Sequence, residues 1–117
     1  MSAGDGTWMP VGTVADVGKQ RRVVVELADE RQILIIAHEG GFHALDNICI
    51  HKQRSMQKGV VLNGRLVCPG HQWAFDLQCG WEAVKNQCQP TYNLRVVDAM
   101  VEVDTSSATT VTEAPVR

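Results

Sequence analysis

Two short segments, each with a cysteine followed closely by a histidine, constrain this chain more than any other feature of its sequence. The side chains in question are Cys49 and His51 in the first segment and Cys68 and His71 in the second. Between the segments lies Asn63-Gly64, a strong hairpin signal because both residues tolerate positive φ. With a hairpin there, residues 60–62 and 65–68 run out and back, so the loops at their open ends meet. The sequence therefore predicts that the two segments form one metal site.

The mixture of ligand types bears on which metal is bound. Two cysteines and two histidines could hold a tetrahedral zinc ion. Zinc fingers, however, usually group cysteine with cysteine and histidine with histidine, whereas each loop here offers one thiolate and one imidazole. This arrangement suits a [2Fe–2S] cluster with cysteines on one iron and histidines on the other. Neutral histidines leave the oxidised cluster uncharged, which raises its reduction potential to roughly −150 to +300 mV, against about −400 mV for plant-type ferredoxins.

Short β-rich runs separated by turn signals follow one another along the chain. The β-branched clusters at 23–25 and 33–36 suit a half-buried or buried sheet. Turns are expected at Gly40-Gly41 and Asp98-Ala99, and no amphipathic helix of convincing length is found. Many short strands at close spacing predict an all-β sandwich or small barrel. The predicted strands are 8–14, 22–27, 32–38, 42–45, 60–62, 65–68, 73–77, 81–84, 92–97 and 100–103.

Length and composition fit one globular domain. The 117 residues are 44% hydrophobic and 21% charged, and their net charge of -2 gives no basic stripe for nucleic acid. No apolar run approaches the roughly 20 residues of a membrane-spanning helix, and no export signal is recognised. We expect a soluble, cytoplasmic protein with a single domain over residues 1–104 and a polar, Ser/Thr-rich tail over 105–117.

The two Cys/His segments and the residues around them resemble the Rieske family. Cys49-Ile50-His51 and Cys68-Pro69-Gly70-His71 are similar to its two ligand boxes, and Gln72-Trp73-Ala74-Phe75-Asp76 is similar to its aromatic-Asp stretch. The resemblance extends from Trp8 to Asp104. It implies an antiparallel β fold with a small cluster-binding subdomain at about residues 47–76, whose two histidines sit at the exposed tip.

Two missing cysteines indicate the subtype. Rieske subunits of respiratory and photosynthetic cytochrome complexes carry an extra cysteine in each box, and these form a disulfide. The corresponding positions here are Arg54 and Gly70. The resemblance therefore implies a low-potential Rieske ferredoxin of a bacterial oxygenase system, such as a dioxygenase of aromatic hydrocarbon catabolism, and not an enzyme. Its partners would be an NAD(P)H-dependent flavin reductase and a terminal oxygenase, both docking at the tip that carries His51 and His71.

Three other functions compete with the ferredoxin. A small subunit of a larger reductase, such as a nitrite reductase, resembles this fold, and a zinc-binding interaction module could use the same four ligands. An oxygenase subunit needs a second iron site with two histidines and a carboxylate. Only His38 and His43 remain for such a site, and both are expected at strand ends of the β scaffold.

The remaining cysteines and aromatic residues are expected to be structural. Cys79 and Cys88 lack histidine partners at ligand spacing, so we expect simple thiols, with a labile disulfide as the alternative. Trp73 and Phe75 are expected to pack the cluster loop rather than to conduct electrons, because aromatic side chains contribute large buried area.

A basic run lies beside the first ligand segment. It consists of Lys52, Arg54 and Lys58. Surface charges near a loop are common, but positive charge here would also steer an acidic face of a redox partner toward the cluster. Such steering is the functional hypothesis for this run.

Overall fold

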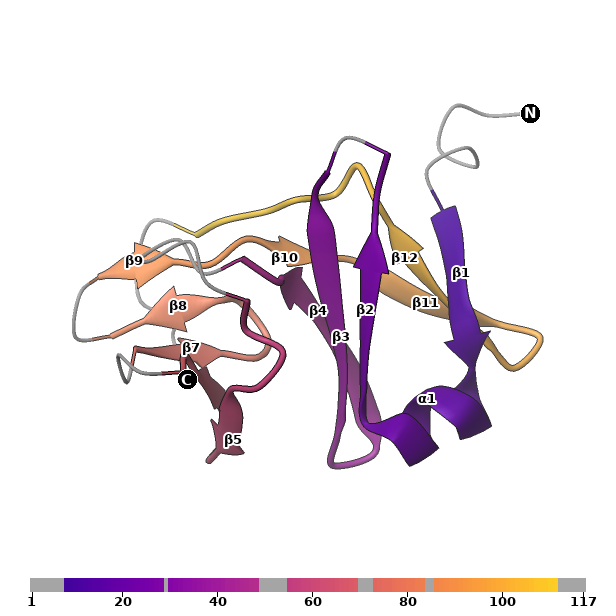
Figure 1. The fold of residues 1–117 in the computed structure, drawn as a ribbon, viewed down its shortest axis with the longest axis horizontal. Coiled ribbons are helices and arrows are strands. Elements are labelled where there is room, and N and C mark those ends of the chain that lie inside the picture. Colours follow the sequence, from indigo (N-terminus) through magenta and orange to yellow (C-terminus); the bar gives the residue numbers. More distant parts are fainter. Residues whose placement is uncertain (1–7, 29, 49–54, 70–72, 84–85, 112–117) are drawn as a thin grey trace.

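The computed structural model describes residues 8–28, 30–48, 55–69, 73–83 and 86–111. Within these ranges the chain consists of short strands and one helix (Figure 1). The elements are β1 (Trp8–Thr13), α1 (Val14–Gln20), β2 (Arg22–Glu26), β3 (Gln32–His38), β4 (Gly41–Asp46), β5 (Val60–Leu62), β6 (Arg65–Val67), β7 (Ala74–Asp76), β8 (Trp81–Glu82), β9 (Gln87–Cys88), β10 (Thr91–Tyr92), β11 (Leu94–Val97) and β12 (Met100–Asp104).

All strand pairs in this part of the chain are antiparallel, which confirms the predicted fold class. A four-stranded sheet of order β10-β4-β3-β2 lies in the middle of the molecule (Figure 1). The sheet β1-β12-β11 lies on one side of it, and the small sheets β5-β6-β7 and β8-β9 lie on the other. The two ligand segments belong to this second side, because they follow β4 and β6 in the chain.

The centre of the middle sheet is β3, which is buried on both faces. Its residues alternate between two hydrophobic cores, as the two-residue period of a strand requires. Ile33 and Ile35 pack in the core shared with β12, whereas Leu34 and Ile36 pack in the core beneath the β5-β6-β7 sheet. All four of these residues are at most 2% exposed. The unbroken apolar run in the sequence therefore marks the strand that joins the two halves of the molecule.

Three hairpin turns have positive φ at both central residues, the conformation that matches the twist of the flanking strands. Asn63 and Gly64, with φ of 52° and 74°, connect β5 to β6 as predicted. The turn between β3 and β4 is formed by Glu39 and Gly40, one residue earlier than predicted, because Gly41 pairs with His38 as part of β4. The third turn, at residues 98–99, lies where the sequence predicts it.

Helix α1 contradicts the expectation that the chain contains no convincing helix. The side chain of Thr13 caps its first turn by accepting a hydrogen bond from the Asp16 amide (3.1 Å), and Arg21 ends it in a left-handed conformation with φ 69°. The predicted strand 8–14 consequently ends at Thr13. The helix has seven residues and only Val17 is buried, so it is too short to show helical periodicity in the sequence.

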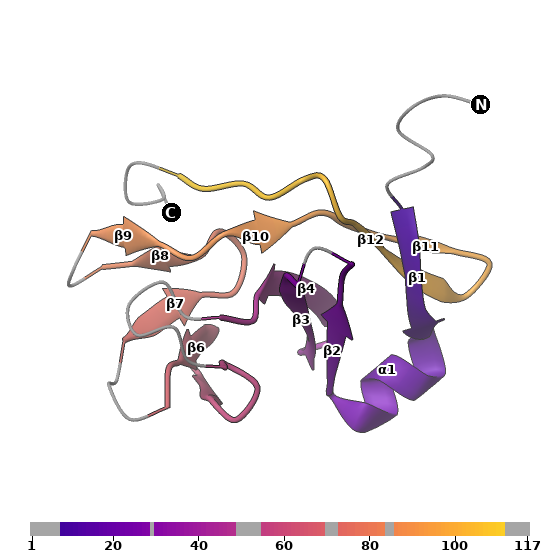
Figure 2. The same cartoon turned by 45° about the horizontal axis from the view of Figure 1, so that its top comes forward.

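The segment after β12 is more ordered by hydrogen bonds than a tail would be. Residues 105–111 run alongside β10 (Figure 2), where Thr109 forms an isolated bridge with Thr91. The Ser107 hydroxyl accepts a hydrogen bond from the Asn93 amide (2.8 Å). The polar composition misled the sequence interpretation, because Ser and Thr hydroxyls bond to backbone without needing a buried apolar face. In the part of the chain that the structure describes, no helix is long and apolar enough to cross a membrane.

Candidate metal centre

Of the four predicted ligands, Cys68 is the one that the structure describes. It lies directly after β6 and is 1% exposed. Its amide donates a hydrogen bond to the carbonyl of Trp73 (2.7 Å). The two residues that flank the segment 69–72 are therefore hydrogen-bonded to each other. Cys49, His51 and His71 lie outside the described residues, as do Arg54 and Gly70, the two positions from which the sequence predicts the absence of a disulfide.

The first ligand segment is also anchored at both ends. Ile48 and Ser55, which flank residues 49–54, form an antiparallel bridge. The buried side chain of Asn47 supports this bridge, because its Nδ2 donates to Ser55 Oγ (3.0 Å) and to Gln32 Oε1 (2.8 Å). The Met56 amide bonds to the Asn47 carbonyl (2.6 Å). Each ligand segment is therefore a loop closed at its base by backbone hydrogen bonds.

The bases of the two loops lie against each other. Met56 and Cys68 belong to the same buried core, and Gly59 lies against the backbone of Met56 and of Val67, the residue before Cys68. A Cβ placed on Gly59 would lie 2.4 Å from the Val67 carbonyl and 3.1 Å from the Met56 carbonyl, so only glycine allows this approach. The hairpin thus brings the two segments together at their bases, as the sequence reasoning required.

A buried glutamine that the sequence reasoning missed braces the first loop. Gln89, directly after β9, is 0% exposed, and its Nε2 donates to the carbonyls of Asp46 (2.7 Å) and Ile48 (2.8 Å). Ile48 immediately precedes Cys49. The only sequence signal for this role is a glutamine beside a proline at the end of a β run, which is not specific.

The aromatic residues after the second loop pack as predicted. Phe75 is fully buried in the same core as Cys68, and Trp73 is partly buried against it. Their ring centroids are 6.3 Å apart at an interplanar angle of 46°. The two rings therefore support the base of the second loop.

The donor set of the two segments fits the predicted cluster. Cys68 offers a thiol at a buried position whose backbone amide is hydrogen-bonded, and the sequence places one further cysteine and two histidines in the two segments. Among the described residues, no group of three or more His, Cys, Asp or Glu side chains could hold a metal ion. His38 and His43 therefore have no third described ligand with them.

His43 lies between the middle sheet and β7. It lines a surface cavity of about 330 Å³ together with His38, Gly64, Asp76 and Leu77. Burial lowers the pKa of His43 below its usual 6.5, and the nearby His38 lowers it further, while Asp76 and a hydrogen bond with the Leu77 backbone act in the opposite direction. The imidazole of His43 that lines this cavity is therefore neutral at neutral pH.

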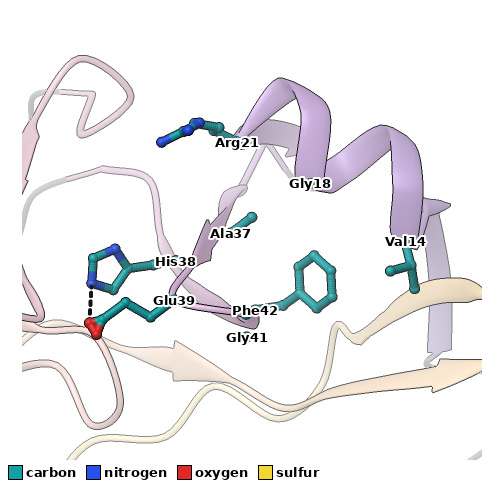
Figure 3. Close-up of a pocket in the computed structure, with 9 residues that line it drawn as sticks. Val14, Gly18, Arg21, Ala37, His38, Glu39, Gly41 and Phe42 are labelled. Carbon is teal, nitrogen blue, oxygen red and sulfur yellow. Dashed lines mark ion pairs between the residues drawn. The ribbon is translucent and has the colours of Figure 1, made fainter.

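A second cavity, of about 390 Å³, lies between α1 and the β3–β4 hairpin (Figure 3). Arg21 lines it on the helix side, and Val14 and Phe42 give it an apolar wall. His38 Nε2 lies 3.5 Å from Glu39 Oε2 at its edge. This cavity was not foreseen because α1, which forms one of its walls, was not predicted.

Comparison with known families identifies the family of the chain. A family model described as the Rieske [2Fe-2S] domain matches residues 7–100. Since this is well over half of the chain, the protein belongs to the Rieske [2Fe–2S] domain family. The predicted resemblance and the predicted cofactor are thereby confirmed, whereas the assignment of the four individual ligands stays a prediction.

Relatives of the chain include ferredoxin components of bacterial oxygenase systems. The ferredoxin component of the alkene monooxygenase system of Xanthobacter autotrophicus is 34% identical over 79 residues, which cover 65% of this chain and 64% of the relative. The ferredoxin component of the naphthalene 1,2-dioxygenase system of Pseudomonas putida is 28% identical over 107 residues, which cover 85% of this chain and 96% of the relative. The match thus spans just under two thirds of the first relative and nearly all of the second.

Two solved structures share the fold. One is the complex of reduced oxygenase and oxidized ferredoxin in carbazole 1,9a-dioxygenase, with a TM-score of 0.78, 20% identity, and coverage of 88% of this chain and 97% of that chain. The other is a small subunit assigned to an NADH-dependent nitrite reductase of Mycobacterium tuberculosis, with a TM-score of 0.72, 24% identity, and coverage of 82% and 92%. At these identities the likeness establishes the fold alone, which both functional hypotheses share.

Proposed function

We propose that this protein is the Rieske ferredoxin of a bacterial multicomponent oxygenase system and carries single electrons from an NAD(P)H-dependent flavin reductase to a terminal oxygenase. The observation that carries the proposal is the likeness over nearly the full length of an oxygenase ferredoxin component, within a chain that belongs to the Rieske family. The functional unit is residues 1–104, with a cluster-binding subdomain at about 47–76.

Four side chains would hold the [2Fe–2S] cluster. Cys49 and Cys68 would bind one iron, and His51 and His71 the other. Bound in this way, the cluster supplies a centre that accepts and releases one electron. The described residues support this role by fixing the chain on either side of each ligand segment: Ile48 is bridged to Ser55, and the Cys68 amide donates to the Trp73 carbonyl.

A spectroscopic experiment on the purified holoprotein tests the function. We expect visible absorption from the cluster, an EPR signal after reduction, and reoxidation of the reduced protein when it is mixed with a terminal oxygenase in a stopped-flow instrument. A colourless protein containing zinc would favour the interaction module. A cluster that the flavin reductase cannot reduce, in a protein that copurifies with a large reductase subunit, would favour the nitrite-reductase type of subunit.

Substitution of the predicted ligands tests the site separately. We expect His71→Ala and Cys68→Ala to abolish the EPR signal, because each removes a ligand that the fold cannot replace. His38→Ala and Cys79→Ala are the matched controls, since neither is a predicted ligand, and both should retain the signal. Retention of the full signal in either ligand variant would refute the assignment of that residue.

The basic run beside the first loop is proposed to steer the partners. Lys58 is exposed, and Lys52 and Arg54 lie outside the described residues. If these charges guide docking, Lys52→Glu/Arg54→Glu should slow electron transfer at low salt and flatten its dependence on ionic strength, because steering acts on the association rate. Lys19→Glu/Arg21→Glu, at the end of α1, is the control with equal charge change. An unchanged rate and salt slope in the double variant would sink the steering hypothesis.

A further inference from the structure

Two cysteines outside the metal centre lie next to each other in the fold. Cys79 lies in the turn after β7, and Cys88 ends β9. The sulfur of Cys88 lies 3.1 Å from the carbonyl oxygen of Cys79, to which its S–H donates. Both are free thiols and both are partly exposed to solvent.

The backbone between them is built for this close approach. Gly80 has φ 79°, and its carbonyl accepts the Gln89 amide (2.8 Å). A Cβ at Gly80 would lie 1.9 Å from the Gln89 carbonyl, so the chain beside Cys79 comes closer to β9 than any other residue type would allow.

This approach puts the two cysteines within bonding range. Because a carbonyl oxygen lies about 2.4 Å from its own Cα, the Cys88 sulfur is within about 5.5 Å of Cys79 Cα. In a disulfide the two Cα atoms are themselves 4.4–6.8 Å apart. The Cys88 sulfur therefore lies close to the Cys79 backbone, and we expect the two sulfurs to meet after rotation of the side chains and a small shift of the turn that carries Cys79.

The surroundings of Cys88 favour a thiol that stays protonated at first and reacts second, after another cysteine has been oxidised. Burial raises the pKa of the Cys88 thiol, while a hydrogen bond from the Val111 amide (3.3 Å to Sγ) lowers it and the neighbouring Cys79 raises it. Cys88 is therefore mainly protonated at neutral pH and its S–H is held against the Cys79 backbone. The N–H of Val111 is placed to stabilise the thiolate once the proton leaves.

We propose that Cys79 and Cys88 form a reversible disulfide when the protein meets hydrogen peroxide. The Cys79 thiolate attacks the peroxide, the O–O bond breaks, and Cys79 becomes a sulfenic acid with release of hydroxide, which takes up a proton to give water. The Cys88 thiolate then attacks the Cys79 sulfur, the S–O bond breaks, and a second water is formed. Two thiols are oxidised by two electrons and one peroxide is reduced to two waters.

The disulfide would link the turn after β7 to β9, the strand that directly precedes Gln89. Gln89, which holds the carbonyls of Asp46 and Ile48, directly follows Cys88. The disulfide therefore closes the β8–β9 hairpin beside the first ligand loop while leaving the cluster ligands untouched. This inference does not depend on the identity of the redox partners, because it uses only residues outside the metal centre.

Peptide mapping of the peroxide-treated holoprotein tests the proposal. Remaining thiols are blocked before denaturation, and the protein is cleaved after Phe75 and Lys85, which places Cys68, Cys79 and Cys88 on three different peptides. We expect a linked pair of peptides containing Cys79 and Cys88, formed while the visible absorption of the cluster is retained and lost again with dithiothreitol. Cys79→Ser and Cys88→Ser should each abolish the link, and each should keep the cluster spectrum.

Three results would overturn the proposal. One is oxidation of the two cysteines to separate sulfinic acids without a link, and another is the absence of oxidation at peroxide doses that already bleach the cluster. The third is a link that appears only after bleaching, or that joins Cys88 to Cys68, because it would arise from ligands released by the cluster. If the Cys88→Ser variant folds poorly, the Cys79→Ser variant, altered in a turn, gives the same test.

Discussion

The buried side chain of Gln89 stabilises the residues before Cys49 by donating hydrogen bonds to the carbonyls of Asp46 and Ile48. Gln89→Met, which keeps length and flexibility but removes the donor, should destabilise the protein by about 1–3 kcal/mol, because the part-buried carbonyls of Asp46 and Ile48 both lose a partner and a fully buried unpaired group costs roughly 1–3 kcal/mol. The measurement is the shift in the urea midpoint followed by circular dichroism and by cluster absorption.

Gln87→Met on the same strand is the matched control, because Gln87 is exposed. A control as destabilised as Gln89→Met would show that the strand tolerates no methionine, and the bracing role would then lose its support. The side chain of Gln89 would equally lose that role if its variant unfolded at the wild-type midpoint.

At this scale the sequence indicates candidate ligands by their chemistry but does not indicate the residues that support them. A thiol and an imidazole repeated in two segments have few other uses, so Cys68 and its three partners could be proposed as ligands. Gln89 meets Ile48 across 41 positions of chain, and Asn47 meets Gln32 across 15. Glutamine and asparagine are common surface residues, so only the folded structure shows which of them is buried against a loop.

The β8–β9 hairpin, as an element, depends on one glycine. Gly80→Ala should cost about 3 kcal/mol or more, because the overlap with the Gln89 carbonyl adds to the cost of positive φ. Gly64→Ala at φ 74°, with open space around its Cβ position, should cost only about 1–2 kcal/mol from the backbone conformation.

Thermal unfolding of the two variants, measured side by side, checks the difference. Equal losses would mean that β9 moves away from residue 80 at little cost, and the close approach of the two strands would then be soft. A larger loss for Gly80→Ala supports the tight geometry on which the Cys79–Cys88 inference rests.

Helices, strands and turns were predictable from the sequence where residues close together in the chain determine them. The Asn63-Gly64 turn follows from the tolerance of both residues for positive φ, and the apolar run 33–36 follows from burial. Helix α1 escaped because its seven residues depend on a Thr13 cap and on contacts with β1, β2 and β12 more than on periodicity. The segment 105–111 escaped because its bonds reach Thr91, Asn93 and Cys88, which are distant in sequence.

His43, which lies on β4 of the middle sheet near Asp76 and Leu77, makes the free energy of unfolding depend on pH. The pKa of His43 is lowered in the folded protein, so the unfolded chain binds more protons as pH falls below 6.5. Its stabilising contribution is thus fully present above pH 6.5 and is lost as pH falls toward the folded pKa.

Unfolding midpoints between pH 5 and 8 test this dependence. We expect His43→Gln to show a smaller loss of stability at the acid end than the wild type. Asp46 does not confuse the comparison, because both proteins contain it; burial raises its pKa from 3.8, so its effect has the opposite sign and is common to the two curves. Parallel pH curves for the two proteins would show that His43 is not responsible.

Strand β3 has a further consequence for how the molecule loses its structure. Because Ile33 and Ile35 serve one core and Leu34 and Ile36 serve the other, neither core opens without moving the strand on which both are built. We therefore expect the scaffold and the cluster-binding side to unfold as one cooperative unit, with amide protons of this strand exchanging with solvent only when the whole protein unfolds. A redox centre placed on such a unit does not need a rigid loop of its own, since it takes its rigidity from the entire fold.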